Sequence, residues 1–271
     1  MITVVGIFSK VFQLDLFDLL RSVREGNLSV EDAAKSLRLS ALKEIEDACL
    51  DVSREVRKGV PEIIFAENKS MDDLVHIAQS FLEETGRVII TRVSEAQASA
   101  IIKNFEGKAE ILHNAKGRAM VLRRRGSSGP EPRGKVALLT AGTVDIGVAE
   151  EAKTVLEEMG CAVMSTYDVG VAGIHRLFPA VKRVTKDDVD VVIVVAGMEG
   201  ALPSIVNGLV AVPVIGVPSS SGYGAGGKGE GALVAMLQSC SPGLVVVNID
   251  NGVGAAVAAA LIAKRACKRR E

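Results

Sequence analysis

The stretch AGMEGALPSIVNGLVAVPVIGVPSSSGYGAGGKGEGALVAMLQSCSPGLVVVNIDN, residues 196–251, decides how this chain folds. One apolar strand, Val189–Val195, precedes it, and two more, Val212–Val217 and Leu244–Asn248, lie within it. Each strand ends in a loop of glycine, serine or acidic residues, and the small-residue run Ser219–Gly231 leads into a helix. Open α/β sheets bind ligands in the loops at the carboxyl ends of their strands. We therefore expect a ligand site here, with the rest of the chain as its scaffold.

Outward from this stretch, apolar strands alternate strictly with helical patterns from Lys135 to the C-terminal end. The predicted strand and helix pairs are 136–140 with 146–159, 162–167 with 174–184, 189–195 with 202–209, 212–217 with 230–238, and 244–248 with 254–264. Continuous apolar strands joined by helices indicate a parallel sheet that is covered on both faces. Right-handed crossovers make this an α/β fold, a three-layer α/β/α sandwich of the flavodoxin or Rossmann type. The sequence has neither a GxGxxG motif in the first βα turn nor a Walker A motif, which disfavours a standard dinucleotide or P-loop site.

The first half of the chain predicts a smaller α/β domain preceded by helices. Helical patterns cover 14–25, a stretch from Ser29, 41–57, 70–84 and 94–104, and predicted strands cover 62–65, 87–91, 110–112 and 119–122. The segment RRRGSSGPEPR, residues 123–133, has the composition of a linker. The predicted domains are therefore residues 1–126 and 134–271.

Composition excludes several classes of function. The formal net charge of −1 argues against a nucleic-acid partner, because such proteins usually carry a basic surplus. The four cysteines form no CxxC pair and histidines are few, so we expect no zinc site and a reducing, cytoplasmic setting. The apolar run Val189–Val217 is interrupted by Glu199, prolines and glycines, so we expect no membrane span.

Parallel strands bring their carboxyl-terminal loops to one edge of the sheet, and this edge is predicted to collect Asp145, Asp168, His175, Arg176, Glu199, Ser219, Ser220, Ser221, Tyr223, Asp250 and Asn251. Asp145 is either a helix cap or a ligand group. Glu199 lies between two glycines in an apolar loop, where an unpaired carboxylate is costly. His175 and Arg176 can move a proton and hold a phosphate, or form a surface pair. The glycine loop can approach a phosphate closely or act as a flexible lid.

Cys240 is the most reactive side chain of the stretch. It comes from the end of the helix that the glycine loop introduces, not directly after a strand, and its neighbours are serines and a proline. A lone cysteine is often an ordinary small hydrophobe of the core. Nucleophilic work requires a nearby cation, which Lys228 or His175 would have to supply. Both interpretations stay open on the residues alone.

At these motifs the sequence resembles the mutase-type phosphoribosylaminoimidazole carboxylase (PurE-like) family. The motifs are AGTVD at 141–145, GIHR at 173–176, AGMEGALP at 196–203 and VPVIGVP at 212–218. Further motifs are similar to one branch, the LarB family of pyridinium-3,5-biscarboxylic acid mononucleotide synthases in nickel-pincer cofactor biosynthesis. They are SGYG at 221–224, SC at 239–240, VNIDNG at 247–252, Leu50-Asp51 with Arg54, and GVPEIIF at 59–65.

The resemblance implies a substrate, nicotinic acid adenine dinucleotide, and two reactions. The pyridinium ring is carboxylated with CO2 or bicarbonate, and the phosphoanhydride is hydrolysed with release of AMP. Cys240 would form a covalent adduct with the ring, and the other catalytic residues would be Glu199, His175 and Asp145. The residues implied in substrate binding are Arg176, Gly142, Thr143, Gly197, Met198, Ser220, Ser221, Gly222, Tyr223, Lys228, Asp250 and Asn251.

The same resemblance implies Mg2+, whose ligands the sequence does not identify, and a homo-oligomer in the form of a multi-subunit ring or double ring. The segment GGKGE at 226–230 departs from the more apolar pattern of the family, which gives Lys228 a phosphate-binding role. Two alternatives remain. An aminoimidazole ribonucleotide carboxylase or mutase would not need Cys240, and a non-catalytic nucleotide-binding regulatory module would bind without turnover.

Overall fold

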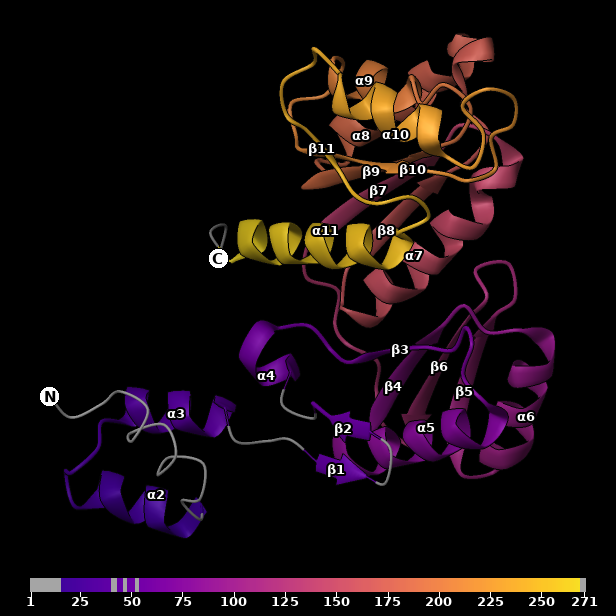
Figure 1. Ribbon diagram of the computed structural model, residues 1–271. Helices are drawn as coiled ribbons and strands as arrows, with labels where there is room; N and C mark the ends of the chain where they lie inside the picture. Colours follow the sequence, from indigo (N-terminus) through magenta and orange to yellow (C-terminus); the bar gives the residue numbers. More distant parts are fainter. Residues whose placement is uncertain (1–15, 40–42, 46–47, 52–53, 269–271) are drawn as a thin grey trace, which may run out of the picture. The chain divides into compact units, whose positions relative to one another are not determined.

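The computed structural model describes residues 16–39, 43–45, 48–51 and 54–268 (Figure 1). The chain divides into two compact units, one of residues 1–62 with 83–85 and one of residues 63–82 with 86–271. The second unit holds two sheets, a five-stranded and a four-stranded one. Both sheets thus belong to one compact unit, and the predicted domains, residues 1–126 and 134–271, stay a prediction.

The first unit contains helices α2 (Leu16–Arg24), α3 (Val30–Leu39) and α4 (Arg54–Lys58) and the antiparallel strands β1 (Lys43–Ile45) and β2 (Ala48–Leu50). The single helix predicted over 41–57 is wrong at 43–45 and 48–50, which form strands, and is confirmed at 54–57, which belong to α4. Residues 41–42, 46–47 and 52–53 lie outside the described residues. Apolar residues at 45, 49 and 50 suit a helix and a short hairpin alike, and strand pairing decides between them. Arg54 Nε lies 3.3 Å from Asp51 Oδ2 and 2.7 Å from Glu62 Oε2.

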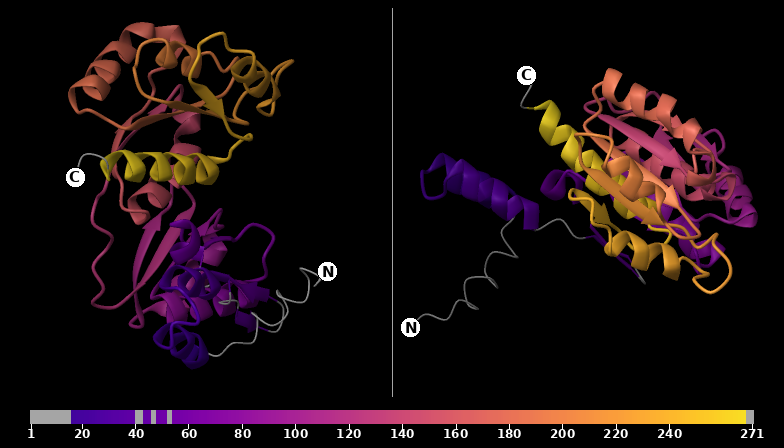
Figure 2. Two further views of the ribbon diagram at one scale, coloured as in Figure 1. Left: turned by 90° about the vertical axis from the view of Figure 1, so that its left-hand side faces the viewer. Right: turned by 90° about the horizontal axis from the view of Figure 1, so that it is seen from above.

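The larger sheet is parallel throughout, as the sequence predicts, and its strand order is β11-β10-β9-β7-β8. Its strands are β7 (Lys135–Thr140), β8 (Ala162–Thr166), β9 (Val191–Ala196), β10 (Val214–Pro218) and β11 (Leu244–Val246). Helices α8 (Leu177–Lys186), α9 (Leu202–Asn207) and α10 (Glu230–Leu237) cover one face, and α7 (Ile146–Glu158) and α11 (Gly252–Cys267) cover the other (Figures 1 and 2). The chain thus forms the predicted three-layer α/β/α sandwich.

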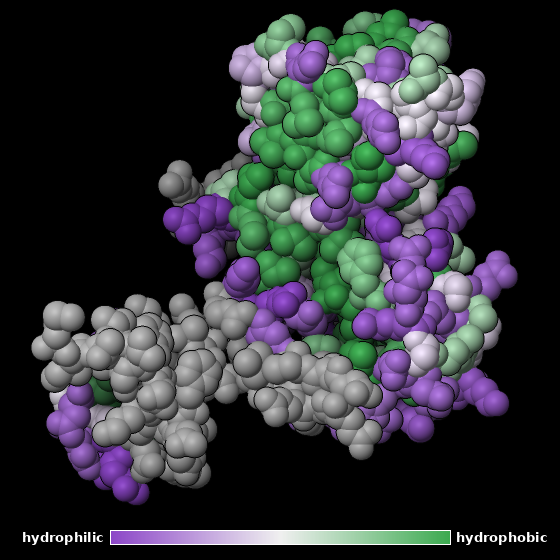
Figure 3. Space-filling model, viewed as in Figure 1, coloured by the Kyte–Doolittle hydropathy of each residue, from purple (hydrophilic) through white to green (hydrophobic). Residues whose placement is uncertain are grey.

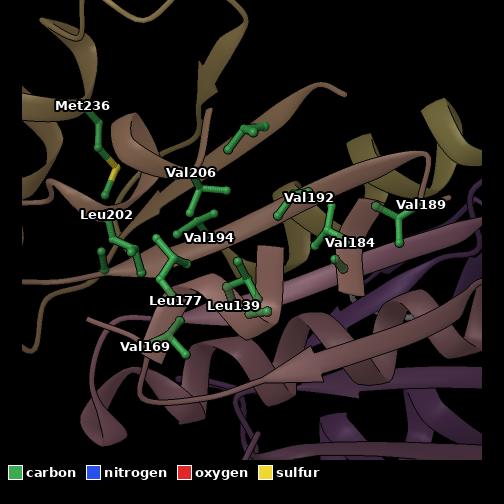
Figure 4. Packing of buried hydrophobic residues seen from close by; sticks show 14 of the residues in the cluster. Leu139, Val169, Leu177, Val184, Val189, Val192, Val194, Leu202, Val206 and Met236 are labelled. Carbon is green, nitrogen blue, oxygen red and sulfur yellow. The ribbon is translucent and has the colours of Figure 1, made fainter. Parts of the chain in front are cut away.

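Figure 4 shows the core between this sheet and α8, α9 and α10. Leu139, Val192 and Val194 point from the sheet toward Leu177 of α8 and Val206 of α9, and all five are fully buried. Each such side chain contributes about 1.5–3 kcal/mol by leaving water. This core fixes the strands, and hence the loops that follow them.

The smaller sheet has the order β3-β4-β6-β5, in which only the β3–β4 pair is parallel. Its elements are β3 (Ile63–Phe65), α5 (Met71–Thr85), β4 (Arg87–Thr91), α6 (Glu95–Phe105), β5 (Ala109–Asn114) and β6 (Ala119–Arg124). Ser70 and Ser94 cap α5 and α6 through their hydroxyl oxygens.

Helix α7 packs against both sheets. Its buried Glu158 binds Arg123 of β6 at 2.6 Å and Arg87 of β4 at 3.2 Å. Gly117, in the β5–β6 turn, lies so close to α7 that a Cβ there would come within 2.6 Å of the Glu150 backbone. Polar contacts and close backbone approach therefore hold the smaller sheet on this helix. Across the described ranges, no helix combines the length and hydropathy needed to cross a bilayer.

Candidate active site

The carboxyl-terminal loops of β7 and β9 diverge at the centre of the larger sheet, where the strand order changes direction, and such a switch point forms a ligand crevice in open α/β sheets. Asp145 lies here and is 2% exposed. Its carboxylate accepts hydrogen bonds from the Gly142 backbone N–H at 2.9 Å and the Ser221 hydroxyl at 2.8 Å. It accepts none from the backbone of α7, at whose N-cap position it stands, and the bond from Gly142 caps the preceding 3-10 helix η1 (Thr143–Asp145), so the predicted cap acts on η1 and not on α7. The carboxylate also ties the β7 loop to the β10 loop.

The β9 and β10 loops pack tightly against each other. Ser219 donates to the Ser221 hydroxyl at 3.0 Å, which extends the hydrogen-bonded chain to Asp145. A Cβ on Gly197 would lie 2.5 Å from Ser221 Oγ, and one on Gly222 would lie 2.8 Å from the Met198 nitrogen. These two glycines are therefore required for the loops to meet, which explains their place in the motifs.

Loops after β8 and β11 complete this edge. Arg176, in the 3-10 segment η2 (Val171–Arg176), pairs with Asp168. Asp250 accepts a hydrogen bond from the Ser220 backbone at 2.8 Å. Asn251 caps α11 by accepting from Gly254 at 2.8 Å, which is a structural role.

The remaining predicted residues of this edge present their side chains to solvent: Thr143, His175, Met198, Glu199, Ser220, Tyr223 and Lys228 are all exposed. The side chains of His175, Glu199 and Lys228 make no hydrogen bond or ion pair with another residue in the described part of the chain. They are thus available to a ligand.

Cys240 lies elsewhere. It is exposed and belongs to the loop between α10 and β11. Because β11 runs parallel to β10, a residue that precedes β11 lies at the amino-terminal edge of the sheet, opposite Asp145. Strands of five or six residues span about 17–20 Å. Within one chain, the thiol is therefore separated from the other predicted site residues by the length of the sheet.

A cavity of about 260 Å³ adjoins the crevice at Ser221. It is lined by Arg92, Lys116 and Arg118 from loops of the smaller sheet, by Glu151 from helix α7, and by Ser221 and Asp250 from loops of the larger sheet. Sequence reasoning missed the first four of these. Arg92 directly follows a predicted strand, which is where ligand-binding loop residues of α/β sheets lie. Lys116 and Arg118 flank a glycine between two predicted strands. The sequence therefore contained a pattern that could have indicated these three residues as ligand-binding candidates. Glu151 lies inside a helix, and no sequence pattern marks it as a candidate.

Glu151 is a buried carboxyl group, 4% exposed, that faces this cavity. Arg92 Nε is 3.6 Å from its Oε1 atom, and Oε1 has no hydrogen-bond partner among the described residues. Burial raises the pKa of Glu151 to about 7, although Arg92 and Arg118 oppose the shift and Asp250 adds to it. The protonated and ionised forms are therefore both accessible near neutral pH.

This shift predicts how Glu151→Gln changes stability. The folded state holds the proton more tightly than the unfolded chain, so wild-type stability falls as pH rises from 4.5 to about 7. The amide mimics the protonated carboxyl, so the variant should be more stable than wild type at pH 8, by up to about 3 kcal/mol, and equal to it near pH 4.5. Urea unfolding at the two pH values measures this difference.

Glu150→Gln is the matched control on the same helix. Burial opposes ionisation of Glu150, but hydrogen bonds from Tyr167 and Asn114 outweigh it and lower the pKa. Its stabilising contribution is present at pH 8 and is lost on acidification, so this variant should lose stability at pH 8. Equal responses of the two variants would contradict the assignment of opposite shifts.

Comparisons with known proteins agree with this architecture. A model of the LarB/PurE-like N-terminal domain matches residues 42–124, and an AIR carboxylase model matches residues 135–270. An uncharacterized protein of Methanocaldococcus jannaschii is 44% identical over 253 residues, which cover 92% of this chain and 97% of that protein. N5-carboxyaminoimidazole ribonucleotide mutase of the same organism is 33% identical over 127 residues, 46% of this chain and 75% of the mutase. The mutase of Pyrococcus horikoshii is 32% identical over 130 residues, 46% of this chain and 69% of that enzyme.

The two domain models together cover both sheets and every loop of the crevice. They indicate a carboxylase-type enzyme with a LarB-like role. The chain belongs to the LarB family, which is related to the PurE-like AIR carboxylases.

Proposed function

We propose that this protein is a pyridinium-3,5-biscarboxylic acid mononucleotide synthase, which catalyses the first step of nickel-pincer cofactor biosynthesis. It carboxylates the pyridinium ring of nicotinic acid adenine dinucleotide with CO2 or bicarbonate and hydrolyses the phosphoanhydride, which releases AMP. The observation that carries the proposal is the exposed thiol of Cys240 in a chain with LarB-type domains.

The thiol would make the pyridinium ring reactive toward CO2. A pyridinium ring is electron-poor, so its C5 carbon does not attack CO2. When the Cys240 thiolate adds to the ring, the C–S bond quenches the ring charge and leaves an enamine with a nucleophilic C5. C5 then forms a bond to CO2 and loses its proton to a base, and the ring electrons expel the thiolate. The ring regains aromaticity with a second carboxylate, and the enzyme is restored.

Side chains at the carboxyl edge fit the other roles. His175 or Glu199 accepts the proton from C5, because both are exposed and free of protein partners among the described residues. Asp145, held by Gly142 and Ser221, faces the ribose, and Arg176 and Lys228 bind phosphate oxygens.

The placement of Cys240 supports an assembly of at least two copies. The thiol and Asp145 lie at opposite edges of the sheet, so the thiol reaches a crevice only when a second copy supplies it. Apolar side chains close to Cys240 in the sequence are exposed: Val234 and Leu237 of α10 and Val245 of β11 are 53%, 65% and 56% exposed. Figure 3 shows hydrophobic residues gathered over this end of the sheet. We propose that a second copy covers this surface in a homo-oligomer.

Mg2+ fits the hydrolytic step as a partner of the substrate rather than of a protein cage. Among the described residues, no three histidine, cysteine or acidic side chains converge on one point. Glu199 has no partner in that part of the chain, and one carboxylate with substrate phosphates is a common Mg2+ environment. Bound there, the ion would neutralise charge on the phosphoanhydride.

The test is mass spectrometry of the protein incubated with nicotinic acid adenine dinucleotide, bicarbonate and Mg2+. Wild type should add one carboxylate to the ring and release AMP. Cys240→Ala should lose ring carboxylation, and Cys267→Ala, which removes another accessible thiol, should keep it. Carboxylation that survives Cys240→Ala removes the thiol from the mechanism.

A second candidate function is the carboxylation or mutase reaction on an aminoimidazole ribonucleotide, because relatives 32–33% identical carry the mutase name. The aminoimidazole ring is already an enamine, so this reaction has no use for Cys240. Turnover of N5-carboxyaminoimidazole ribonucleotide by wild type and Cys240→Ala alike, without turnover of the dinucleotide, would favour it.

A further inference from the structure

The cavity between the two sheets has the chemistry of an anion site. Its lining carries three cations, Arg92, Lys116 and Arg118, against two carboxyl groups, Glu151 and Asp250, so it is net positive. This balance disfavours a metal ion and favours a phosphate. Lys116 is exposed, and its ammonium group makes no hydrogen bond or ion pair within the described ranges. It is therefore free to bind a ligand.

A buried side chain points to the same ligand. Glu151 is 4% exposed, and its Oε1 atom lacks a hydrogen-bond partner among the described residues. A buried polar atom without a partner is costly, and here it borders a cavity large enough for a ligand group. A carboxyl that holds its proton near neutral pH can donate to a phosphate oxygen, which would satisfy this atom.

The backbone of the lining is consistent with a site. Arg92, Arg118 and Asp250 have φ values of 55°, 49° and 53°, in the left-handed region that residues with a side chain rarely adopt. Strained conformations of this kind gather at ligand sites, where the surroundings enforce them. Hydrogen bonds enforce two of them: Arg92 Nη2 donates to the Asp250 carbonyl at 2.8 Å, and Arg118 Nε donates to the Val93 carbonyl at 3.2 Å.

Ser221 lies both in the crevice and in the wall of the cavity. A ligand that occupies the crevice can therefore continue into the cavity. We propose that this cavity is a phosphate subsite for the adenylate half of the dinucleotide, with Lys116 and Arg118 as cationic ligands and the Glu151 carboxyl as a hydrogen-bond donor to a phosphate oxygen. The phosphate chemistry follows from the lining, whereas the adenylate identity rests on the proposed function.

The experiment is calorimetric titration of the full-length protein with AMP at constant ionic strength. Lys116→Ala should weaken AMP binding by about tenfold or more, because it removes a charge-assisted hydrogen bond. Lys153→Ala is the control. Lys153 is on α7, pairs with Glu157 at 4.0 Å and does not line the cavity. Equal AMP affinities of Lys116→Ala and wild type would overturn the subsite.

The role of Glu151 is tested by the same titration between pH 7 and 8.5, where the AMP phosphate stays almost fully dianionic. Wild-type affinity should fall by up to about tenfold per pH unit, because Glu151 must carry its proton into the complex. Glu151→Gln always offers an N–H donor and should show a flatter dependence. The charged groups that face Glu151, namely Arg92, Arg118 and Asp250, are the same in both proteins. Parallel pH profiles would overturn the donor role.

These results separate the subsite from the proposed function. AMP binding that depends on Lys116, in a protein that does not carboxylate the dinucleotide, keeps the subsite and refutes the proposed function. If the protein carboxylates the dinucleotide but Lys116→Ala does not change AMP binding, the proposed function is kept and the subsite is refuted.

Discussion

Two inactive variants mixed within one assembly are expected to recover ring carboxylation. One is Cys240→Ala, and the other is His175→Ala/Glu199→Gln, which removes both candidate proton acceptors. Each alone should lose activity, the first by loss of the nucleophile and the second by about 10²–10⁴-fold. If the thiol comes from a neighbouring copy, a random mixture pairs a native thiol with a native carboxyl edge in about one quarter of its sites. Recovery of about that fraction is the expected result.

Co-expression of the two variants with different affinity tags allows mixed assemblies to be isolated before the assay. Cys240→Ala mixed with a chain that carries all three changes is the control, since no site can then contain a thiol. All three changed residues are exposed, so the variants should fold. Mixed assemblies that form but stay inactive would show that thiol and carboxyl edge do not combine across copies.

Glu158→Ala is expected to be the most destabilising single change considered for the described fold. The Glu158 side chain is 1% exposed and binds Arg123 and Arg87, which are themselves 17% and 19% exposed. Its hydrogen bonds raise the pKa of Arg123, consistent with a tight pair. Removal of one partner from a buried ion pair leaves uncompensated charge and costs about 3–5 kcal/mol. The thermal midpoint should therefore fall by roughly 10 °C.

Glu157→Ala is the matched control for this change. Glu157 is adjacent in α7, but its side chain is 54% exposed and pairs only with Lys153, at 4.0 Å, among the described ion pairs. Exposed pairs of this kind contribute about 0–1 kcal/mol, so the midpoint should barely move. Similar midpoints for the two variants would mean that the smaller sheet is held on α7 by other contacts.

The larger sheet was predictable because its signals are local. The run VVIVVA of β9 is apolar on both faces, which only a strand covered on both sides requires. The β1–β2 hairpin was not predictable, because the apolar residues of its short segments also fit the spacing of a helix. Only the pairing between the two segments makes them strands. The contact between the smaller sheet and α7 could not be predicted for a related reason. Arg87 and Arg123 bind Glu158, from which they are separated by 71 and 35 residues along the chain.

In the candidate site, too, features set by the local strand pattern were predictable, and features set by tertiary contacts were not. Asp145, Ser221 and Asp250 follow strands of one parallel sheet, so their common edge could be derived from the strand pattern alone. The opposite placement of Cys240 was equally available, because a residue that precedes a parallel strand must lie at the other edge. The cavity as a whole could not be predicted from the sequence, because Glu151 comes from helix α7 and Lys116 from the β5–β6 turn, and only the tertiary fold brings them together.

The outer face of α7 makes polar contacts at its junction with the smaller sheet. Its hydrogen bonds and ion pairs with the smaller sheet and its loops involve Glu150, Glu151, Thr154 and Glu158, which are all polar residues. In a protein without the smaller sheet, these polar side chains would be hydrated. Polar contacts of this kind are typical of interfaces between domains of one chain. This junction joins a LarB-type N-terminal module to a PurE-like domain within one chain.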